Sequence, residues 1–306
     1  MQVPPVRVVR RNGIPAVRRF ALNSNPLPAD QEAFLRSIVA QPEDDTTRLV
    51  YADWLEEHGD AEQAAFIRSS IEVHNLQPGP RRTTARDIKL QKVGEGRGRA
   101  WLAAVGVPCA DELSPYFHRG CVEGIECESL GPLFAAAGTL FALFPIRELY
   151  FWWQYSVGLS DSTLVGLAEM PGLERLRRLH LANYDSALGG TEITAEAWGR
   201  FFRCPRLAGL RSLRCEACRL GDANVEALAD APSLAGLTIL SLTSNRIGVP
   251  GVWALLRSPY LRGVTRLSLE QNVVTGDDPA LQEELERRFP GQDPLRQYDD
   301  EGWFAV

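Results

Sequence analysis

The sequence predicts an α/β fold, namely a solenoid with parallel strands on its inner side and helices on its outer side, preceded by a small helical module. The first observation is a repeat, because the pattern Pro-x-apolar-x-x-apolar occurs four times, beginning at Pro171, Pro205, Pro232 and Pro259. The last three prolines are 27 residues apart, and the first interval is 34 residues. The second observation is a helical apolar pattern between successive copies, and the third is purely helical patterning before them.

Each proline lead-in is followed by a strand motif, L-x-x-L-x-L-x-x-N. Its two clearest copies are carried by Leu237, Leu240, Leu242 and Asn245, and by Val264, Leu267, Leu269 and Asn272. Two upstream copies match the motif less closely, with Val122 and Ile146 as their first apolar residues. We therefore expect six parallel strands that begin near residues 122, 146, 176, 210, 237 and 264.

The segments between these strands have the period of a helix. Apolar residues recur at i, i+3 and i+4 in three of them, as Trp198, Phe201 and Phe202, as Val225, Leu228 and Ala229, and as Val252, Leu255 and Leu256. Such triplets form one apolar helix face. A single strand-helix unit cannot cover that face alone, so the units are expected to stack on one another.

The motif and its period resemble the ribonuclease-inhibitor-like class of leucine-rich repeats. The resemblance implies that the side-chain amides of Asn245 and Asn272 pair with the backbone in the turn after each strand. Cys218 falls at the same position of an earlier copy, and Cys215 falls at an inward position of its strand. We expect both thiols to be buried and to bind no metal, although Cys215-Glu-Ala-Cys218 has the spacing of half a zinc site.

Residues 1–28 are expected to form a basic arm or a hairpin. They contain five arginines and no acidic residue, and Asn12-Gly13 separates two extended runs. Asn-Gly is a typical hairpin turn, and a loose arm is an equal alternative.

Residues 29–116 are expected to form the helical module. Apolar residues at helical spacing predict three helices, with faces made by Phe34, Leu35, Ile38 and Val39, by Leu49, Val50, Trp54 and Leu55, and by Ala65, Phe66, Ile67 and Ile71. Asp30 is a candidate N-cap and Gly59 a candidate helix stop. A basic stretch, residues 81–99, is expected to form another helix.

The run Tyr51-Ala-Asp-Trp-Leu-Glu-Glu57, within residues 30–72, resembles the repeat-companion domain. That family is a short helical module found ahead of leucine-rich repeats in bacterial proteins. The resemblance implies a scaffold arrangement and supplies no catalytic residue.

The other boundaries follow from the repeat. The solenoid is expected over residues 117–290 and ends in a cap helix, because Leu281, Leu285 and Phe289 share one helix face. Residues 291–306 are expected to form a tail, and residues 184–191 a protruding loop within the longer interval.

Composition and motifs limit the function. The net charge is −6, no apolar run is long enough to span a membrane, and the N-terminus lacks a signal-peptide core. We therefore expect a cytoplasmic protein without a membrane partner. The chain has no phosphate loop, dinucleotide fingerprint or nucleophile elbow, so we expect a non-enzymatic protein without a cofactor.

The inner face of the solenoid contains the candidate site, because residues between the motif leucines point away from the core. We expect another protein to bind there, at Tyr150, Trp152, Trp153, Arg178, His180, Arg211 and Arg214. Adjacent tryptophans flanked by arginines are typical of interface hot spots. Glu123, Glu126 and Glu128 would make one end of this face acidic. Alternatively, the helical module or the tail covers these aromatic residues.

Two other functions stay open. The basic segments, residues 1–28 and 81–99, could contact nucleic acid, although no aromatic residues interleave with them as stacking platforms. The cluster Asp53, Glu56, Glu57, His58 and Asp60 could bind a divalent metal, although a solvated helix end explains it more simply.

Overall fold

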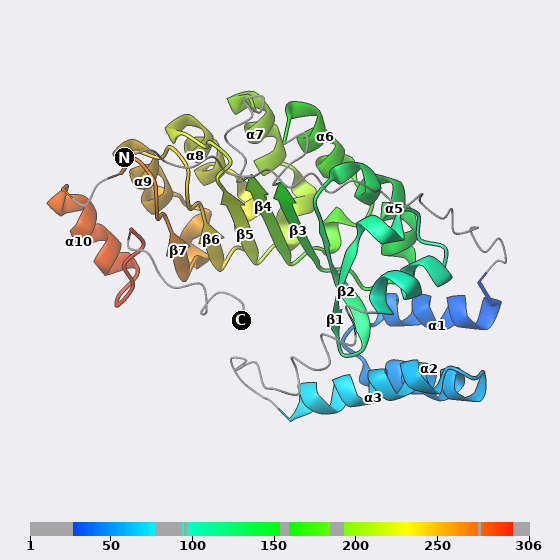
Figure 1. Cartoon of the computed structure of the whole chain (residues 1–306). Helices are drawn as coiled ribbons and strands as arrows, with labels where there is room; N and C mark the ends of the chain where they lie inside the picture. Colours follow the sequence, from blue (N-terminus) through cyan, green and yellow to red (C-terminus); the bar gives the residue numbers. More distant parts are fainter. Residues whose placement is uncertain are drawn as a thin grey trace, which may run out of the picture.

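The computed structural model is an open, seven-stranded, mostly parallel sheet with helices packed along one face (Figure 1). It describes residues 27–76, 94, 97–153, 159–183, 193–274 and 277–295. The strands follow one another in chain order across the sheet, from β1 to β7. Residues 1–26 of the predicted arm or hairpin, the loop of 184–191, residues 296–306 of the tail and most of the basic stretch lie outside the described residues.

Six strands pair in parallel, as the repeat predicts. They are β2 (Cys121–Cys127), β3 (Glu148–Trp153), β4 (Arg178–Asn183), β5 (Ser212–Glu216), β6 (Ile239–Ser241) and β7 (Arg266–Ser268). The strand β1 (Ser114–His118) precedes them and is antiparallel to β2. The strand β1 was not predicted, and most of it was expected to belong to the helical module, because Pro115 and the aromatic residues around it follow no repeat.

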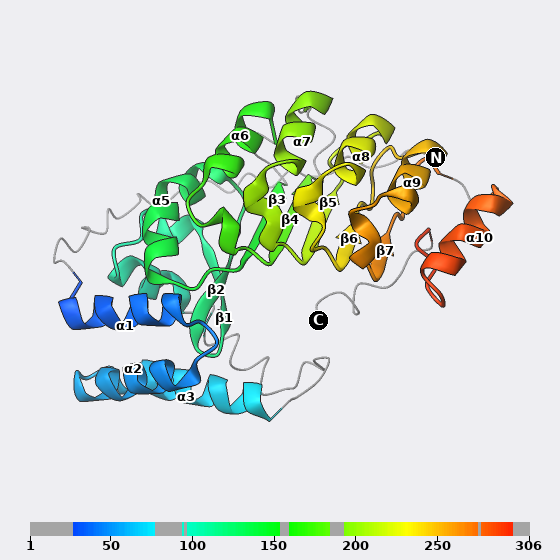
Figure 2. The ribbon, with the colours of Figure 1, turned by 180° about the vertical axis from the view of Figure 1, so that it is seen from behind.

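The helices between the strands lie on one face of the sheet in chain order (Figure 2). They are α5 (Leu130–Leu143), α6 (Asp161–Glu169), α7 (Ala195–Phe202), α8 (Asp222–Ala229) and α9 (Val249–Arg257). Short 3-10 turns, such as Pro205–Gly209 and Pro232–Leu234, lead from a helix into the next strand. Pro205 and Pro232 of the repeat pattern begin these two turns, and Pro171 and Pro259 lie two residues before the equivalent turns Leu173–Arg175 and Leu261–Gly263.

A repeated backbone joint fixes each strand to the next. The carbonyl oxygen of Arg177 accepts hydrogen bonds from the backbone N–H groups of both Arg211 and Ser212. Carbonyl oxygens at the same position of other repeats also accept two backbone N–H groups each, and they belong to Arg147, Arg211 and Thr238. Stacking in this fold is therefore specified by the main chain as well as by the apolar core.

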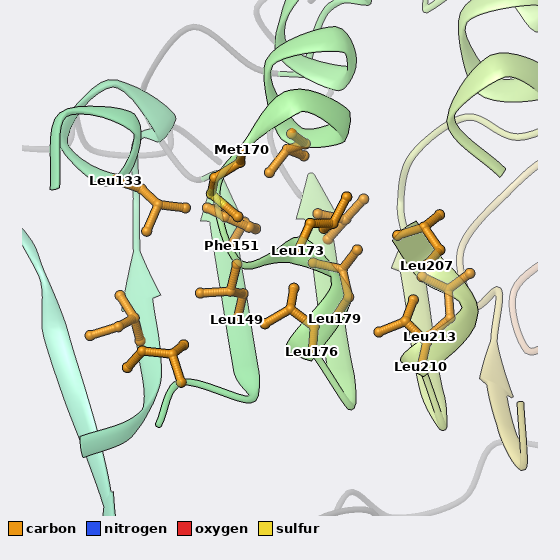
Figure 3. Packing of buried hydrophobic residues seen from close by; sticks show 14 of the residues in the cluster. Leu133, Leu149, Phe151, Met170, Leu173, Leu176, Leu179, Leu207, Leu210 and Leu213 are labelled. Carbon is orange, nitrogen blue, oxygen red and sulfur yellow. The ribbon is translucent and has the colours of Figure 1, made fainter. Parts of the chain in front are cut away.

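The core lies between the sheet and its helices (Figure 3). Leu149 and Phe151 of β3 and Leu179 of β4 point from their strands toward the helical layer, where Met170 meets them. The same cluster of buried apolar side chains continues from Leu35 in the first helix to Phe289 near the C-terminal end. A continuous core of this kind matches units that bury their apolar faces only by stacking.

Asparagine side chains hold the turns that follow the last strands. The amide nitrogen of Asn245 donates to the carbonyls of Cys215, Leu242 and Thr243, at 2.7, 2.8 and 3.1 Å, and its oxygen accepts the N–H of Leu220. Asn272 makes the equivalent set of bonds one repeat later. The predicted pairing of these amides with the backbone is therefore confirmed.

Cys218 takes the place of asparagine in the preceding turn. Its thiol lies 3.4 Å from the carbonyl oxygen of Leu181 and 3.3 Å from that of Glu216. Cys215 and Cys218 are both buried, as predicted, and burial raises the pKa of each thiol. Both side chains belong to the packed interior of the repeat.

The N-terminal module consists of α1 (Ala29–Ala40), α2 (Asp45–Glu57), α3 (Ala61–Asn75) and a helical segment at residues 97–104. The helix α1 packs against α5, so the module closes the first end of the stack. Asp30 is not the cap of α1, because the helix begins earlier, after Pro28. Gly59, at φ 92°, ends α2 as expected.

The buried face of α2 differs from the predicted one. Leu49 and Val50 are 38% and 47% exposed, whereas Arg48, Tyr51 and Leu55 are buried. Leu55 is buried and Trp54 packs against the core, as predicted. The prediction was wrong for Leu49 and Val50, since the buried Arg48 and Tyr51 occupy the inward positions instead. The helix is capped by Asp44, whose side chain accepts the N–H groups of Thr46 and Thr47.

The helix α10 (Pro279–Arg288) closes the other end of the stack (Figure 1). Leu281, Leu285 and Phe289 are buried, and Arg288 donates to the carbonyls of Leu261 and Arg262 in the last repeat. The predicted cap helix is therefore confirmed. None of the helices in the described part of the chain is both long and apolar enough to cross a membrane.

Candidate functional site

The candidate site lies on the sheet face opposite α5–α9. Strand register aligns its side chains in rows that cross the repeats. One row contains Glu126, Tyr150, His180, Arg214, Ser241 and Ser268, and the row before it contains Gly124, Glu148, Arg178, Ser212, Ile239 and Arg266. In Figure 1 this face of β3, β4 and β5 is turned toward the viewer, and no helix of the described residues crosses it.

An aromatic belt centres on Tyr150 and His180 of the first of these rows. The rings of Tyr116 and Tyr150 lie 5.3 Å apart, and Tyr150 lies 6.3 Å from the ring of His180. Trp152 meets the same His180 ring edge to face at 5.0 Å. Tyr116, Tyr150 and Trp152 are each half-buried.

Carboxylates orient the tyrosines of this belt. The Tyr150 hydroxyl donates to Glu148 at 2.6 Å, and the Tyr116 hydroxyl donates to Glu126. Arg178 donates to the other oxygen of Glu148, at 2.7 Å. Burial and the negative charge of Glu148 raise the pKa of Tyr150, so its hydroxyl keeps its proton and acts as a donor.

Glu216 organises the next part of the face. One of its oxygens lies 3.1 Å from Nε2 of His180, and the other accepts the hydroxyl of Ser241 at 3.0 Å and lies 3.9 Å from Arg214. His180 and Glu216 are only 3% and 8% exposed. They therefore position the Trp152 ring and Arg214 from below, rather than offering a large contact area of their own.

The structure brings five of the seven predicted site residues together, namely Tyr150, Trp152, Arg178, His180 and Arg214. Arg211 lies at the start of β5, is exposed, and donates to the carbonyls of Leu210 and Gly236. It therefore borders the face, next to the repeated backbone joint. Trp153 lies in β3, and its side chain is outside the described residues.

Glu123 does not contribute to the proposed acidic end of this face. It is 6% exposed and accepts a hydrogen bond from Arg48 of α2 at 2.8 Å. Nδ1 of His118 lies 3.3 Å from the same oxygen. Burial alone would raise the pKa of Glu123, but His118 and the charges of Arg48 and Arg119 outweigh it and lower that pKa. Glu123 thus fastens the helical module to the sheet.

A second set of charges strengthens this junction. Glu43, in the turn before α2, pairs with Arg119 at 2.8 Å and with Arg147 at the start of β3. The hydrogen bond and the charge of Arg147, helped by Arg119, lower the pKa of Glu43 to about 2. The helical module therefore ends beside the candidate face, and its described residues leave Trp152 half-buried.

The acidic cluster at the end of α2 has structural partners. Asp53 and Glu56 both pair with Arg68 of α3, at 2.6 and 2.7 Å, and Asp60 caps α3 through the N–H of Gln63. His58 stacks on Trp54, with ring centroids 4.1 Å apart. Among the residues that the structure describes, no three His, Cys, Asp or Glu side chains are grouped so that they could hold a metal ion.

Sequence reasoning missed Tyr116 as a member of the face, and it placed Ser241 and Ser268 there without assigning them to the site. Tyr116 belongs to β1, which carries no copy of the repeat motif. Ser241 and Ser268 occupy motif positions but were not singled out, because a serine alone indicates no particular chemistry. Their role comes from the row, in which Ser241 supports Glu216.

The comparisons with known proteins leave the family of this chain open. No family model matches the sequence, and no curated protein matches it. Among solved structures, the chain is similar to the crystal structure of a protein from Bacteroides fragilis, a structural genomics target. The two share 17% sequence identity with a TM-score of 0.38, and the match covers 50% of this chain and 43% of that chain.

Proposed function

We propose that this chain is a leucine-rich-repeat protein of the ribonuclease-inhibitor-like type, working in the cytoplasm, whose open sheet face binds another protein. In this proposal α1–α3 correspond to a repeat-companion module. The chain then acts as a scaffold and catalyses no reaction. The observation that carries the proposal is the half-buried belt of Tyr116, Tyr150 and Trp152 on a sheet face opposite the helices.

The composition of the belt supports protein binding. Tryptophan, tyrosine and arginine dominate measured hot spots, where the contact is centrally placed and shielded from water. Trp152, Tyr150 and Arg178 supply these residue types, and they lie close enough to act as one patch, since neighbouring strands are only about 4.8 Å apart. The buried pair of His180 and Glu216 beneath them restricts their rotamers, which lowers the entropy lost on binding.

The chain offers a matched pair of tryptophans for the test. Trp152→Ala removes the ring on the open face, whereas Trp253→Ala removes a ring on α9, where it stacks with Arg257 at 4.8 Å. Tagged full-length protein and both variants are used to capture partners from a lysate of the native source. We expect Trp152→Ala to lose the captured protein, with about 2 kcal/mol or more of binding energy, and Trp253→Ala to retain it.

Thermal unfolding separates a binding role from a structural one. The proposal requires that Trp152→Ala leaves the melting temperature within a few degrees of the parent protein. It fails if this variant loses several kcal/mol of stability, or if both variants capture the same protein equally well. Nucleic acid in the captured material, released steeply by salt, would favour the alternative function through the basic segments.

A further inference from the structure

The described chain ends at the free edge of the sheet. After α10 it turns back toward β7, where the side chain of Gln292 donates to the carbonyl of Thr265 at 2.7 Å. The N–H of Leu269 then donates to the carbonyl of Pro294 at 2.8 Å. Residues 292–294 therefore run beside β7, and Leu295 packs against the core. The next residues leave from the border of the candidate face.

Residues 296–306, which follow Leu295, lie outside the described part of the chain. Their sequence contains three consecutive acidic residues, Asp299, Asp300 and Glu301. It also contains the aromatic residues Tyr298, Trp303 and Phe304. An acidic and aromatic segment of 11 residues thus begins next to the open face.

The nearest part of that face is complementary to this segment. Three arginines lie in its rows, Arg266 on β7, Arg214 on β5 and Arg178 on β4. The side chain of Arg178 is 39% exposed and that of Arg214 is 14% exposed. Between them the rows hold small or short side chains, namely Ser212, Ile239, Ser241 and Ser268. Glu216 and Glu270 are each 8% exposed, and both lie within hydrogen-bonding distance of serine hydroxyls, Glu216 with Ser241 and Glu270 with Ser268. A third carboxylate, Glu148 on β3, accepts a hydrogen bond from Arg178 at 2.7 Å. An incoming chain therefore meets arginines above a floor of short, mostly polar side chains.

We propose that residues 296–306 dock in cis across the open faces of β7 to β4, with Asp299, Asp300 and Glu301 at the arginines and Trp303 toward Trp152. The length fits. An extended chain covers about 3.3 Å per residue, so Glu301 reaches about 20 Å from Leu295 and Trp303 about 26 Å. Four strand spacings of about 4.8 Å, from β7 to β3, come to about 19 Å.

This inference goes beyond the proposed function, since docking of the tail needs no partner. It adds that any partner of the open face competes with the tail. A tethered segment has an effective concentration in the millimolar range. A ligand in trans that uses the same arginines is therefore weakened by about 10-fold or more in the intact chain.

The experiment uses the full-length chain and a fluorescently labelled peptide of residues 296–306. Binding is measured by anisotropy with the parent protein and with the full-length variant D299N/D300N/E301Q, whose own tail lacks the acidic side chains. We expect the variant to bind the peptide at least about 10-fold more tightly than the parent, because its face is free of the competing tail. A peptide with the same composition in scrambled order is the control.

Substitutions on the face test the location. In the neutral-tail background, R214Q/R266Q is expected to abolish peptide binding, whereas R200Q/R203Q on the outer side of α7 is expected to preserve it. The proposal is overturned if neither parent nor variant binds the peptide, if both bind it equally tightly, or if the scrambled peptide binds as well. None of these outcomes affects the capture lost by Trp152→Ala, so failure here is distinguishable from failure of the proposed function.

Discussion

Arg48 and Glu123 carry opposite charges at the centre of the junction between the helical module and the sheet. Arg48 is fully buried, and its Nη2 donates to Glu123 and to the carbonyl of Pro42. Removing one member of a buried pair leaves an uncompensated charge, which typically costs about 3–5 kcal/mol. We expect Arg48→Met to lower the free energy of unfolding by this amount in urea at pH 7.

The exposed pair of Arg68 with Asp53 is the matched control. These side chains are 36% and 65% exposed, so Arg68→Met should cost less than about 1 kcal/mol. The double variant Arg48→Met/Glu123→Leu should recover much of the loss, because it leaves no buried charge. A cost below about 1 kcal/mol for Arg48→Met would show that the pair does not fasten the module.

At the scale of elements, the cap helix makes a sharp prediction. Leu285 of α10 is 4% exposed, whereas Glu283 of the same helix is exposed. Replacing a buried leucine with alanine typically costs about 2–5 kcal/mol, because the transfer energy is lost and a cavity remains. We expect Leu285→Ala to destabilise the chain by this amount and to promote aggregation through the uncovered last repeat, as followed by thermal unfolding and light scattering.

Glu283→Ala tests whether the effect belongs to the buried face. It should change the unfolding free energy by less than about 0.5 kcal/mol, since exposed positions away from packed groups tolerate substitution. If the two variants behave alike, α10 does not close the stack.

Elements that carry the repeat could be predicted from the sequence, and elements that close it only in part. Leucine spacing indicated β2 to β7, and Asn245 indicated the turn bonds, because each repeat uses the same local contacts. The predicted face of α2 was wrong at Leu49 and Val50, because Arg48 is inward only as the partner of Glu123, which lies 75 residues away. Long-range pairs of this kind leave no periodic signal.

The residues of the candidate face could be predicted from the sequence, but not how deeply each side chain is buried. Alternation along the strands placed Tyr150, Trp152 and Arg178 correctly on one side of the sheet. The sequence could not show that His180 lies under Trp152, or that Glu123 turns toward α2. Burial on a sheet face depends on the sizes and charges of side chains in neighbouring strands.

For the whole molecule, the ionic junction predicts how stability depends on pH. The pKa of Glu43 is about 2 in the folded chain, below its ordinary value of 4.5. A lowered pKa in the folded state stabilises the protein fully above about 4.5, and this contribution is lost as pH falls toward 2. The lowered pKa of Glu123 acts in the same direction. We expect the urea midpoint to fall between pH 4.5 and pH 2.

Glu43→Gln isolates one contribution to this profile. The variant should have a lower midpoint than the parent at pH 7 and a flatter decline below pH 4.5, because its side chain takes up no proton. Glu226→Gln, on the exposed side of α8, should reproduce the parent profile. Parallel curves for the parent protein and Glu43→Gln would contradict the assignment.

The backbone joint at the start of each strand is independent of the side chain that carries it, since arginine and threonine serve equally at Arg177 and Thr238. The last units of the chain therefore repeat the joint every 27 residues. Adding one whole repeat unit would keep every joint and move the two closed ends one strand further apart, by about 4.8 Å. The longer interval from Arg177 to Arg211 keeps the same joint, so extra residues within a unit are accommodated between the strands and add no strand to the sheet. The distance between the helical module and the cap helix therefore changes in steps of one strand spacing.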